Sequence, residues 1–145
     1  HSLEVQIPFL QTLQPDFRFS AVCIRTMELD VLEALGQAMA RVIQARKEPV
    51  LLIASSDMSH YETSDSAARQ DQFAIDQMLA IDPSGLHSVV LEKRISMCGF
   101  ASATAVLTAC RDLGATKGKL IRYTTSGEAS GDYDRVVAYA GIAIS

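Results

Sequence analysis

Residues 50–55 constrain the fold more than any other part of the chain. They form an uninterrupted apolar run, Val-Leu-Leu-Ile-Ala, that ends at Ser55. A strand that is buried on both faces has this composition, and such strands occupy the centre of parallel sheets that helices cover. The run is far shorter than the roughly 18 to 20 residues of a membrane-spanning helix. We therefore expect an α/β sandwich with a mixed, largely parallel central sheet flanked by helices.

The remaining segments supply helices and further strands for a single domain over residues 1–145. Apolar residues at helical spacing predict helices, whereas alternation and β-branched or aromatic residues predict strands. The predicted helices cover residues 1–13, 31–46, 84–92 and 100–113. A further helix should start at a cap formed by Ser64 or Asp65 and end before Pro83. Pro8 should kink or end the first helix. The predicted strands cover residues 17–26, 50–55, 119–125 and 135–145, the last of them buried on both sides.

Composition and charge narrow the classes of partner and compartment. The formal net charge is −4 and the 13 Lys and Arg residues are scattered, so no basic stripe is available for nucleic acid. We expect no nucleic-acid and no membrane partner, and a small molecule or a peptide instead. Three widely spaced cysteines without a Cys-x-x-Cys pair favour a reducing compartment, the cytoplasm. Cys23 and Cys110 lie on apolar faces and are interpreted as core residues.

Asp57 and His60 follow directly on the predicted central strand, within the sequence Ser-Ser-Asp-Met-Ser-His. Ligands of open α/β sheets bind beyond the carboxyl ends of the strands, which makes this loop a candidate site. At this spacing the carboxylate could orient the imidazole, or both could face one ligand, in a metal site or an acid–base pair. The alternative is structural: a helix cap beside a hydrogen-bonded loop histidine.

Cys98 precedes Gly99 at the predicted start of the alanine-rich helix over residues 100–113. The positive end of a helix dipole favours a thiolate, which suits a nucleophile with His60 as its base, or a metal ligand. The alternative is a small residue packed under the site, because free cysteine is commonly buried. The terminal His1 carries no signal of its own, and His87 is assigned no role.

Several motifs occur in a fixed order from one end of the chain to the other. They are His-Ser-Leu-Glu-Val-Gln-Ile-Pro-Phe-Leu at residues 1–10, Ser-Ser-Asp at 55–57 with His60, Cys-Gly at 98–99, Tyr-Thr-Thr-Ser-Gly at 123–127 and Val-Val-Ala-Tyr-Ala-Gly at 136–141. As an ordered set they resemble the Memo family, whose prokaryotic members are called AmmeMemoRadiSam system protein B. The resemblance covers the whole chain, which is similar to the C-terminal part of a Memo-like domain.

The resemblance implies a fold similar to that of the class III extradiol dioxygenases, with a pocket lined by histidines. Those enzymes use non-haem iron, whereas Memo proteins are described as metal-binding with no agreed reaction. By motif match, His1 and Cys98 stand at metal-ligand positions, and Asp57 and His60 stand in the pocket wall. We expect His1, His60 and Cys98 to hold a metal, and Asp57, His60 and Cys98 to be catalytic. A thiolate beside imidazole suits iron, copper or zinc.

Two departures from the family pattern bear on partners and on metal affinity. The family's Pro-His-x-Gly-Tyr segment, which carries another histidine ligand, is missing, and Phe100 follows Cys98-Gly99 where a polar or basic residue is expected. With His1 at a free chain end, metal binding by this chain alone is expected to be weak. A sheet built to be covered by the other half would expose an edge and an apolar patch. We expect homodimerisation, or a companion segment that carries the N-terminal half.

Three functions remain compatible with these residues. The first is a metal-associated pocket of an oxidoreductase-like enzyme. The second is a non-catalytic module that binds a phosphorylated or other acidic peptide, as the resemblance to animal Memo suggests. The third is a cysteine hydrolase that uses Cys98 with His60 and needs no metal.

Overall fold

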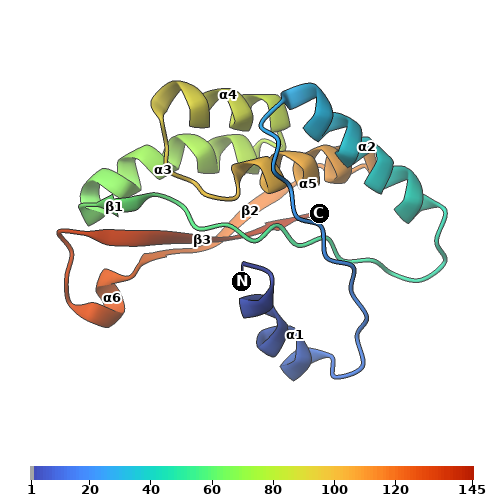
Figure 1. Cartoon of the computed structure of the whole chain (residues 1–145), viewed down its shortest axis with the longest axis horizontal. Coiled ribbons are helices and arrows are strands. Elements are labelled where there is room, and N and C mark those ends of the chain that lie inside the picture. The colour runs from blue at the N-terminus through green and yellow to red at the C-terminus, as the bar shows by residue number, and fades with distance from the viewer. Residues whose placement is uncertain (1) are drawn as a thin grey trace.

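The computed structural model describes residues 2–145, so the predicted ligand His1 lies outside the described residues. One helical layer covers a small sheet; it consists of α2 (Leu29–Gln44), α3 (Ser64–Leu79), α4 (Pro83–Lys93) and α5 (Phe100–Asp112). Figure 1 shows α1 (Ile7–Leu13) on the other side of the sheet, apart from this layer. The predicted α/β class is confirmed, but the helical layer covers one face of the sheet rather than both.

The sheet within residues 2–145 has three strands in the order β1-β3-β2. Its strands are β1 (His60–Glu62), β2 (Gly118–Thr125) and β3 (Val136–Ile144). Both pairs are antiparallel, so the expectation of a largely parallel sheet is wrong. The two strands predicted near the C-terminus are confirmed as β2 and β3. However, β3 is not buried on both sides, because its residues alternate between buried and more exposed positions.

The two segments predicted to extend the sheet, residues 17–26 and 50–55, are not strands. No backbone hydrogen bond joins residues 18–25 or 50–54 to any part of the chain from residue 2 onward. A strand exists only as part of a ladder, so these segments lie beside no neighbour that could define them as strands. Leu51, in the supposed central strand, is 77% exposed. A largely parallel sheet needs these two segments as members, and without them only antiparallel pairs remain among residues 2–145.

The helices follow the predicted ranges closely, and their termini show why. Side chains of Thr63 and Asp82 accept hydrogen bonds from backbone amides in the first turns of α3 and α4, as helix caps do. Pro8 does not kink the opening helix; it lies in the first turn of α1, where its missing N–H is not needed. A one-turn 3-10 helix (Glu4–Gln6) precedes α1, and the short helix α6 (Gly127–Ser130) lies between β2 and β3.

The core lies between the helical layer and the sheet. Its fully buried members include Ile75 of α3, Leu86 of α4 and Val136 of β3. Cys110 is half-buried and burial raises the pKa of its thiol, whereas Cys23 is exposed, so the interpretation of Cys23 as a core residue is wrong. Cys23 lies in one of the two segments that form no backbone hydrogen bonds within residues 2–145. Over residues 2–145, no helix is both long enough and apolar enough to cross a membrane.

Candidate metal centre

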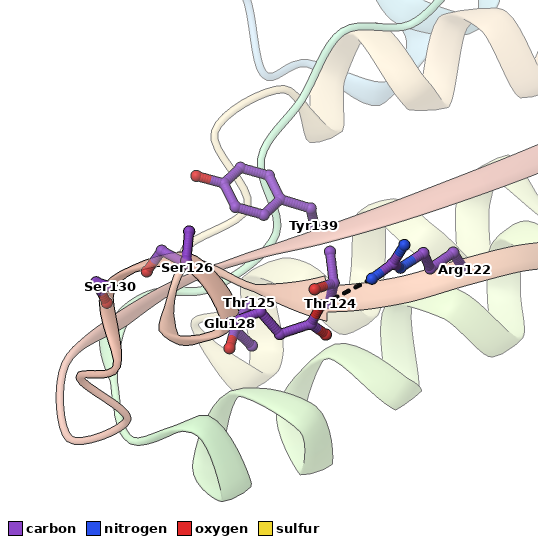
Figure 2. A pocket seen from close by; sticks show the side chains of 8 residues that line it. Arg122, Thr124, Thr125, Ser126, Glu128, Ser130 and Tyr139 are labelled. Atoms are coloured by element: carbon purple, nitrogen blue, oxygen red, sulfur yellow. Dashed lines mark hydrogen bonds and ion pairs between the residues drawn. The ribbon is translucent and has the colours of Figure 1, made fainter.

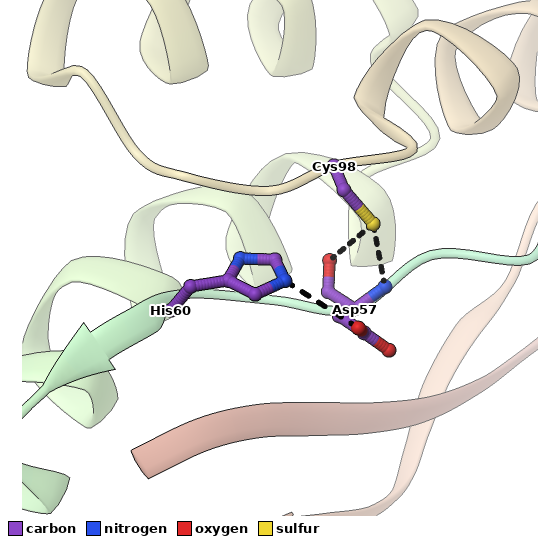
Figure 3. Close-up of side chains that lie close together, drawn as sticks. All are labelled: Asp57, His60 and Cys98. Atoms are coloured by element: carbon purple, nitrogen blue, oxygen red, sulfur yellow. Dashed lines mark hydrogen bonds and ion pairs between the residues drawn. The ribbon is translucent and has the colours of Figure 1, made fainter. Parts of the chain in front are cut away.

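Asp57, His60 and Cys98 come together at one point of the fold, although Cys98 follows His60 by 38 positions in the sequence. One carboxylate oxygen, one imidazole nitrogen and the sulfur all lie within 4.8 Å of one another (Figure 3). It is the only such group of three or more His, Cys, Asp or Glu ligand atoms in the part of the chain that the structure describes. Sequence reasoning therefore selected residues that do meet in space; their roles as ligands or catalysts remain predictions.

The backbone around Asp57 and His60 is fixed by its contact with β3. The amide of Met58 donates to the carbonyl of Ala138 at 2.8 Å, and the amide of Ala138 donates to the carbonyl of Ser59 at 2.9 Å. The pairing register then shifts between His60 and Glu62. Tyr61, between them, has a φ of 62°, a left-handed conformation that suits a local irregularity of this kind. The backbone that carries His60 is therefore held in place at the start of β1.

Ser96 holds His60 through both its backbone and its side chain. The amide of His60 donates to Ser96 Oγ at 2.8 Å, and its ring Nδ1 lies 2.6 Å from the carbonyl oxygen of Ser96. A carbonyl only accepts hydrogen bonds, so Nδ1 must carry the proton. In the neutral imidazole this leaves Nε2 with a free lone pair. The arrangement is the one by which metal-ligating histidines are usually oriented.

His60 Nε2 and Asp57 Oδ2 are 3.4 Å apart, and both side chains are partly open to solvent. With its lone pair free, Nε2 would face a carboxylate oxygen that also carries lone pairs. The two atoms need a positive charge between them: a proton on Nε2 or a metal cation. A tetrahedral zinc ion bound at about 2.1 Å would hold nitrogen and oxygen ligands about 3.4 Å apart. The observed separation therefore fits a small metal ion.

Cys98 reaches the pair from the loop that precedes α5. The amide of Asp57 donates to Cys98 Sγ at 3.2 Å, which holds the sulfur beside the other two side chains. The thiol is exposed, so the alternative interpretation of Cys98 as a packed core residue is wrong. A zinc-bound sulfur would lie about 3.6 Å from nitrogen and oxygen ligands, so a shift of about 1 Å would complete the coordination. Nitrogen, oxygen and sulfur donors together suit zinc, copper or iron.

Gly99 allows the Cys98 loop to approach residues 55–57. Its amide donates to Ser56 Oγ at 2.8 Å. A Cβ at this position would lie 2.6 Å from the carbonyl oxygen of Ser55 and 2.6 Å from Ser56 Cβ, which is closer than real Cβ contacts allow. Glycine is needed here for close approach of two backbones, and it brings the thiol next to Asp57.

A buried polar network lies behind the metal group, and sequence reasoning missed it. The carboxylate of Asp71 in α3 is fully buried and accepts hydrogen bonds from the Ser59 amide, the Ser59 hydroxyl and the Tyr123 hydroxyl. Burial raises the pKa of Asp71, although these hydrogen bonds act in the opposite direction. A signal was available, because Asp71 shares one helical face with apolar residues, namely Ala67, Ala74, Ile75 and Met78. A single carboxylate on an apolar helix face needs hydrogen-bond donors when that face is buried.

The loop after β2, which carries Glu128, Asp132 and Asp134, borders a hollow. Figure 2 shows side chains of this hollow, which has a volume of about 740 Å³ and is lined by Arg122, Glu128 and Tyr139 among others. Arg122 Nη2 and Glu128 Oε2 form an ion pair at 2.7 Å. Within the described residues, the loop's acidic side chains form no group of three ligand atoms. The metal-type donors are at residues 57, 60 and 98 instead.

Comparison with known proteins gives matches along nearly the whole chain. A family model described as "Memo-like protein" matches residues 1–143. The chain is 40% identical over 143 residues to a MEMO1 family protein of Nitrosopumilus maritimus, an alignment that covers 98% of this chain and 51% of the relative. For MEMO1 family proteins of Methanopyrus kandleri and Methanosarcina mazei the identities are 39% and 38%, with 50% and 54% of those relatives covered. The chain thus spans about half the length of the curated relatives it matches. It belongs to the Memo-like protein family.

Proposed function

We propose that Asp57, His60 and Cys98 bind a metal ion in the pocket of an oxidoreductase-like enzyme. The observation that carries this proposal is the orientation of His60. Its Nδ1 is bonded to the Ser96 carbonyl, and its Nε2 lies 3.4 Å from Asp57 Oδ2 with the Cys98 sulfur alongside. When bound, the metal would act as a Lewis acid or redox centre for a small substrate. Asp57 is more exposed to solvent than His60, and its carboxylate could accept a proton from that substrate.

Metal content and Co²⁺ spectroscopy test the proposal directly. Titration of the metal-free chain with Co²⁺ should give a sulfur-to-metal charge-transfer band and one equivalent of bound ion. Cys98→Ser should abolish that band, and His60→Ala should weaken binding by at least tenfold. The matched control is Cys23→Ser, which removes an exposed thiol elsewhere. Equal binding by the wild-type chain and both site variants would overturn the proposal.

A cysteine hydrolase is the second candidate, because an imidazole nitrogen of His60 lies within 4.8 Å of Cys98 Sγ and could serve as its base. The carboxylate of Asp57 beside Nε2 supports the metal function more, since in a hydrolase a carboxylate usually orients the other ring nitrogen. Hydrolysis of a thioester or ester substrate that persists in a chelator and stops on alkylation of Cys98 would favour the hydrolase. Binding of an acidic peptide ranks third, because Asp57 repels an anion unless a cation is present.

We also propose that a companion polypeptide covers the open side of this fold. The unpaired segments expose apolar side chains, among them Phe19, Val22, Leu51 and Ile53, and α1 exposes Phe9 and Leu13. An exposed patch of this kind marks an interaction surface. The relatives are about twice as long as this chain, so a segment equivalent to their unmatched half is an occupant of suitable size. Its strands could pair with residues 50–54, whose backbone groups lack partners within residues 2–145.

Light scattering and hydrogen exchange test this partner. The unmatched half of the Nitrosopumilus maritimus relative, added as a separate polypeptide, should form a one-to-one complex and slow amide exchange at residues 50–54. Leu51→Asp should weaken the complex, whereas Val42→Asp, a change at an exposed position on α2, should not. A stable dimer of this chain alone would favour a second copy as the occupant. A monomer in both experiments would contradict any covering partner.

A further inference from the structure

The buried carboxylate of Asp71 holds the residue that lies between two members of the metal group. Ser59 stands between Asp57 and His60 in the sequence, and Asp71 Oδ1 accepts from the Ser59 amide at 3.0 Å and from its hydroxyl at 2.7 Å. The carbonyl of Ser59 is held from the opposite side by the amide of Ala138 at 2.9 Å. Both backbone groups of Ser59 are therefore fixed, one by α3 and one by β3.

The second carboxylate oxygen of Asp71 ties this contact to another strand. It accepts from the Tyr123 hydroxyl at 2.7 Å, and Tyr123 belongs to β2. Across residues 2–145, no Lys or Arg forms an ion pair with Asp71. A buried carboxylate without an ion-pair partner is expensive, and an apolar side chain would fill the same place at lower cost. The stability of the fold therefore does not explain why a carboxylate stands here, and its hydrogen bonds to Ser59 point to a second role.

We propose that Asp71 is a positioning residue, which fixes Ser59 and thereby holds Asp57 and His60 at the separation that a small metal ion requires. This inference rests on the proposed metal function. Without the Asp71 contacts, Ser59 would be held only through its carbonyl to β3, and the backbone between the two ligands would be less constrained. The metal would then have to order the segment on binding, which lowers its affinity. Partners that orient metal ligands contribute roughly 10-fold to 100-fold in affinity.

Two variants remove the network in different degrees. Asp71→Asn keeps the shape of the side chain, removes its charge and leaves one acceptor for Ser59. Tyr123→Phe removes a single donor and is the milder change. The matched control is Thr108→Val, because Thr108 of α5 is also fully buried and its hydroxyl donates to the Thr104 carbonyl, away from the metal group. All proteins are compared at a temperature at which each is fully folded.

The decisive measurements are Co²⁺ affinity, the Co²⁺ spectrum and amide exchange at Ser59. Asp71→Asn should raise the Co²⁺ dissociation constant about 10-fold to 100-fold and alter the ligand-field bands. It should also speed exchange of the Ser59 amide in the metal-free chain, whereas Thr108→Val should change none of the three. If Asp71→Asn fails to fold, Tyr123→Phe serves as the test. It should change the Co²⁺ affinity, the Co²⁺ spectrum and the exchange of the Ser59 amide in the same direction, but by a smaller amount. Wild-type affinity and spectrum in the folded variants would overturn the positioning role. Absence of Co²⁺ binding by the wild-type chain would refute the metal function itself, and the positioning role with it.

Discussion

Ser96 and His60 contact each other twice: the serine hydroxyl accepts from the His60 amide and the serine carbonyl lies against ring Nδ1. The backbone contact decides which nitrogen is free for a ligand, and the hydroxyl contact keeps the two segments in register. Because Ser96 is exposed, water can replace part of what its hydroxyl provides.

Replacement of this hydroxyl should therefore have a modest effect. Ser96→Ala should lower the free energy of unfolding by about 0.5–1.5 kcal/mol, the usual contribution of one hydrogen bond, as measured by urea denaturation. Co²⁺ affinity should fall by a few-fold. Ser88→Ala, a change at an exposed serine on α4, should alter neither quantity. A larger loss of affinity than of stability would show that the hydroxyl also orients the ring.

Substitution of Gly99 should affect stability and the metal group together. In Gly99→Ala the new Cβ would meet backbone and side-chain atoms of residues 55 and 56, so the loop must move away and carry Cys98 with it. We expect a loss of about 1–3 kcal/mol in the free energy of unfolding and loss of the cobalt–sulfur band. Gly141→Ala is the control, because its nearest neighbouring atom would be 3.9 Å away. An unchanged band in Gly99→Ala would mean that the loop can relax without displacing the thiol.

The accessibility of the thiols predicts how alkylation responds to metal. Cys98 and Cys23 are exposed, whereas burial raises the pKa of the half-buried Cys110 thiol and so lowers its thiolate fraction. At pH 8, iodoacetamide should modify Cys23 and Cys98 faster than Cys110. Zn²⁺ should protect Cys98 and leave the rate at Cys23 unchanged, as followed by peptide mass spectrometry. Equal rates at Cys98 with and without Zn²⁺ would argue against coordination by its sulfur.

The half-buried Tyr123 predicts a dependence of stability on alkaline pH. Burial, with help from the Asp71 carboxylate, raises the pKa of Tyr123 above its ordinary value. The folded chain therefore keeps a proton that the unfolded chain releases above about pH 10, so stability should fall as the pH rises past that value. While folded, the wild-type chain and Tyr123→Phe should show the same tyrosinate absorbance. A higher wild-type absorbance before unfolding would contradict the raised pKa.

Local sequence patterns predicted the parts of the fold that depend on local interactions. The helix at residues 100–112 and the two strands at 118–125 and 136–144 appear within a few residues of their predicted bounds. Residues 17–26 and 50–55 have equally good strand composition, but a ladder needs a neighbour and composition cannot supply one. For the same reason Leu51, which the pattern predicted to be buried, is exposed.

The candidate site shows the same division. Cys98 could be selected because it precedes a helix whose start is recognisable from the sequence, whereas Asp57 and His60 stand out only by following residues 50–55, which do not form the predicted strand. Their supporting residues could not be selected in this way. Ser96 contacts His60 across 36 residues and Tyr123 contacts Asp71 across 52, and hydrogen bonds between such distant residues depend on the packing of α3, β2 and β3. His1 lies outside the described residues, so its proposed ligation stays a prediction.

The unpaired backbone of residues 50–54 and the carboxylate of Asp57 belong to one continuous segment. Any chain that adds a strand along residues 50–54 would stiffen the same backbone that presents Asp57 to a ligand. Thermodynamic linkage then requires the reverse effect: an ion held by Asp57 favours the strand pairing by the same free energy by which the pairing favours the ion. Binding of the partner chain and binding of the ion would thus strengthen each other.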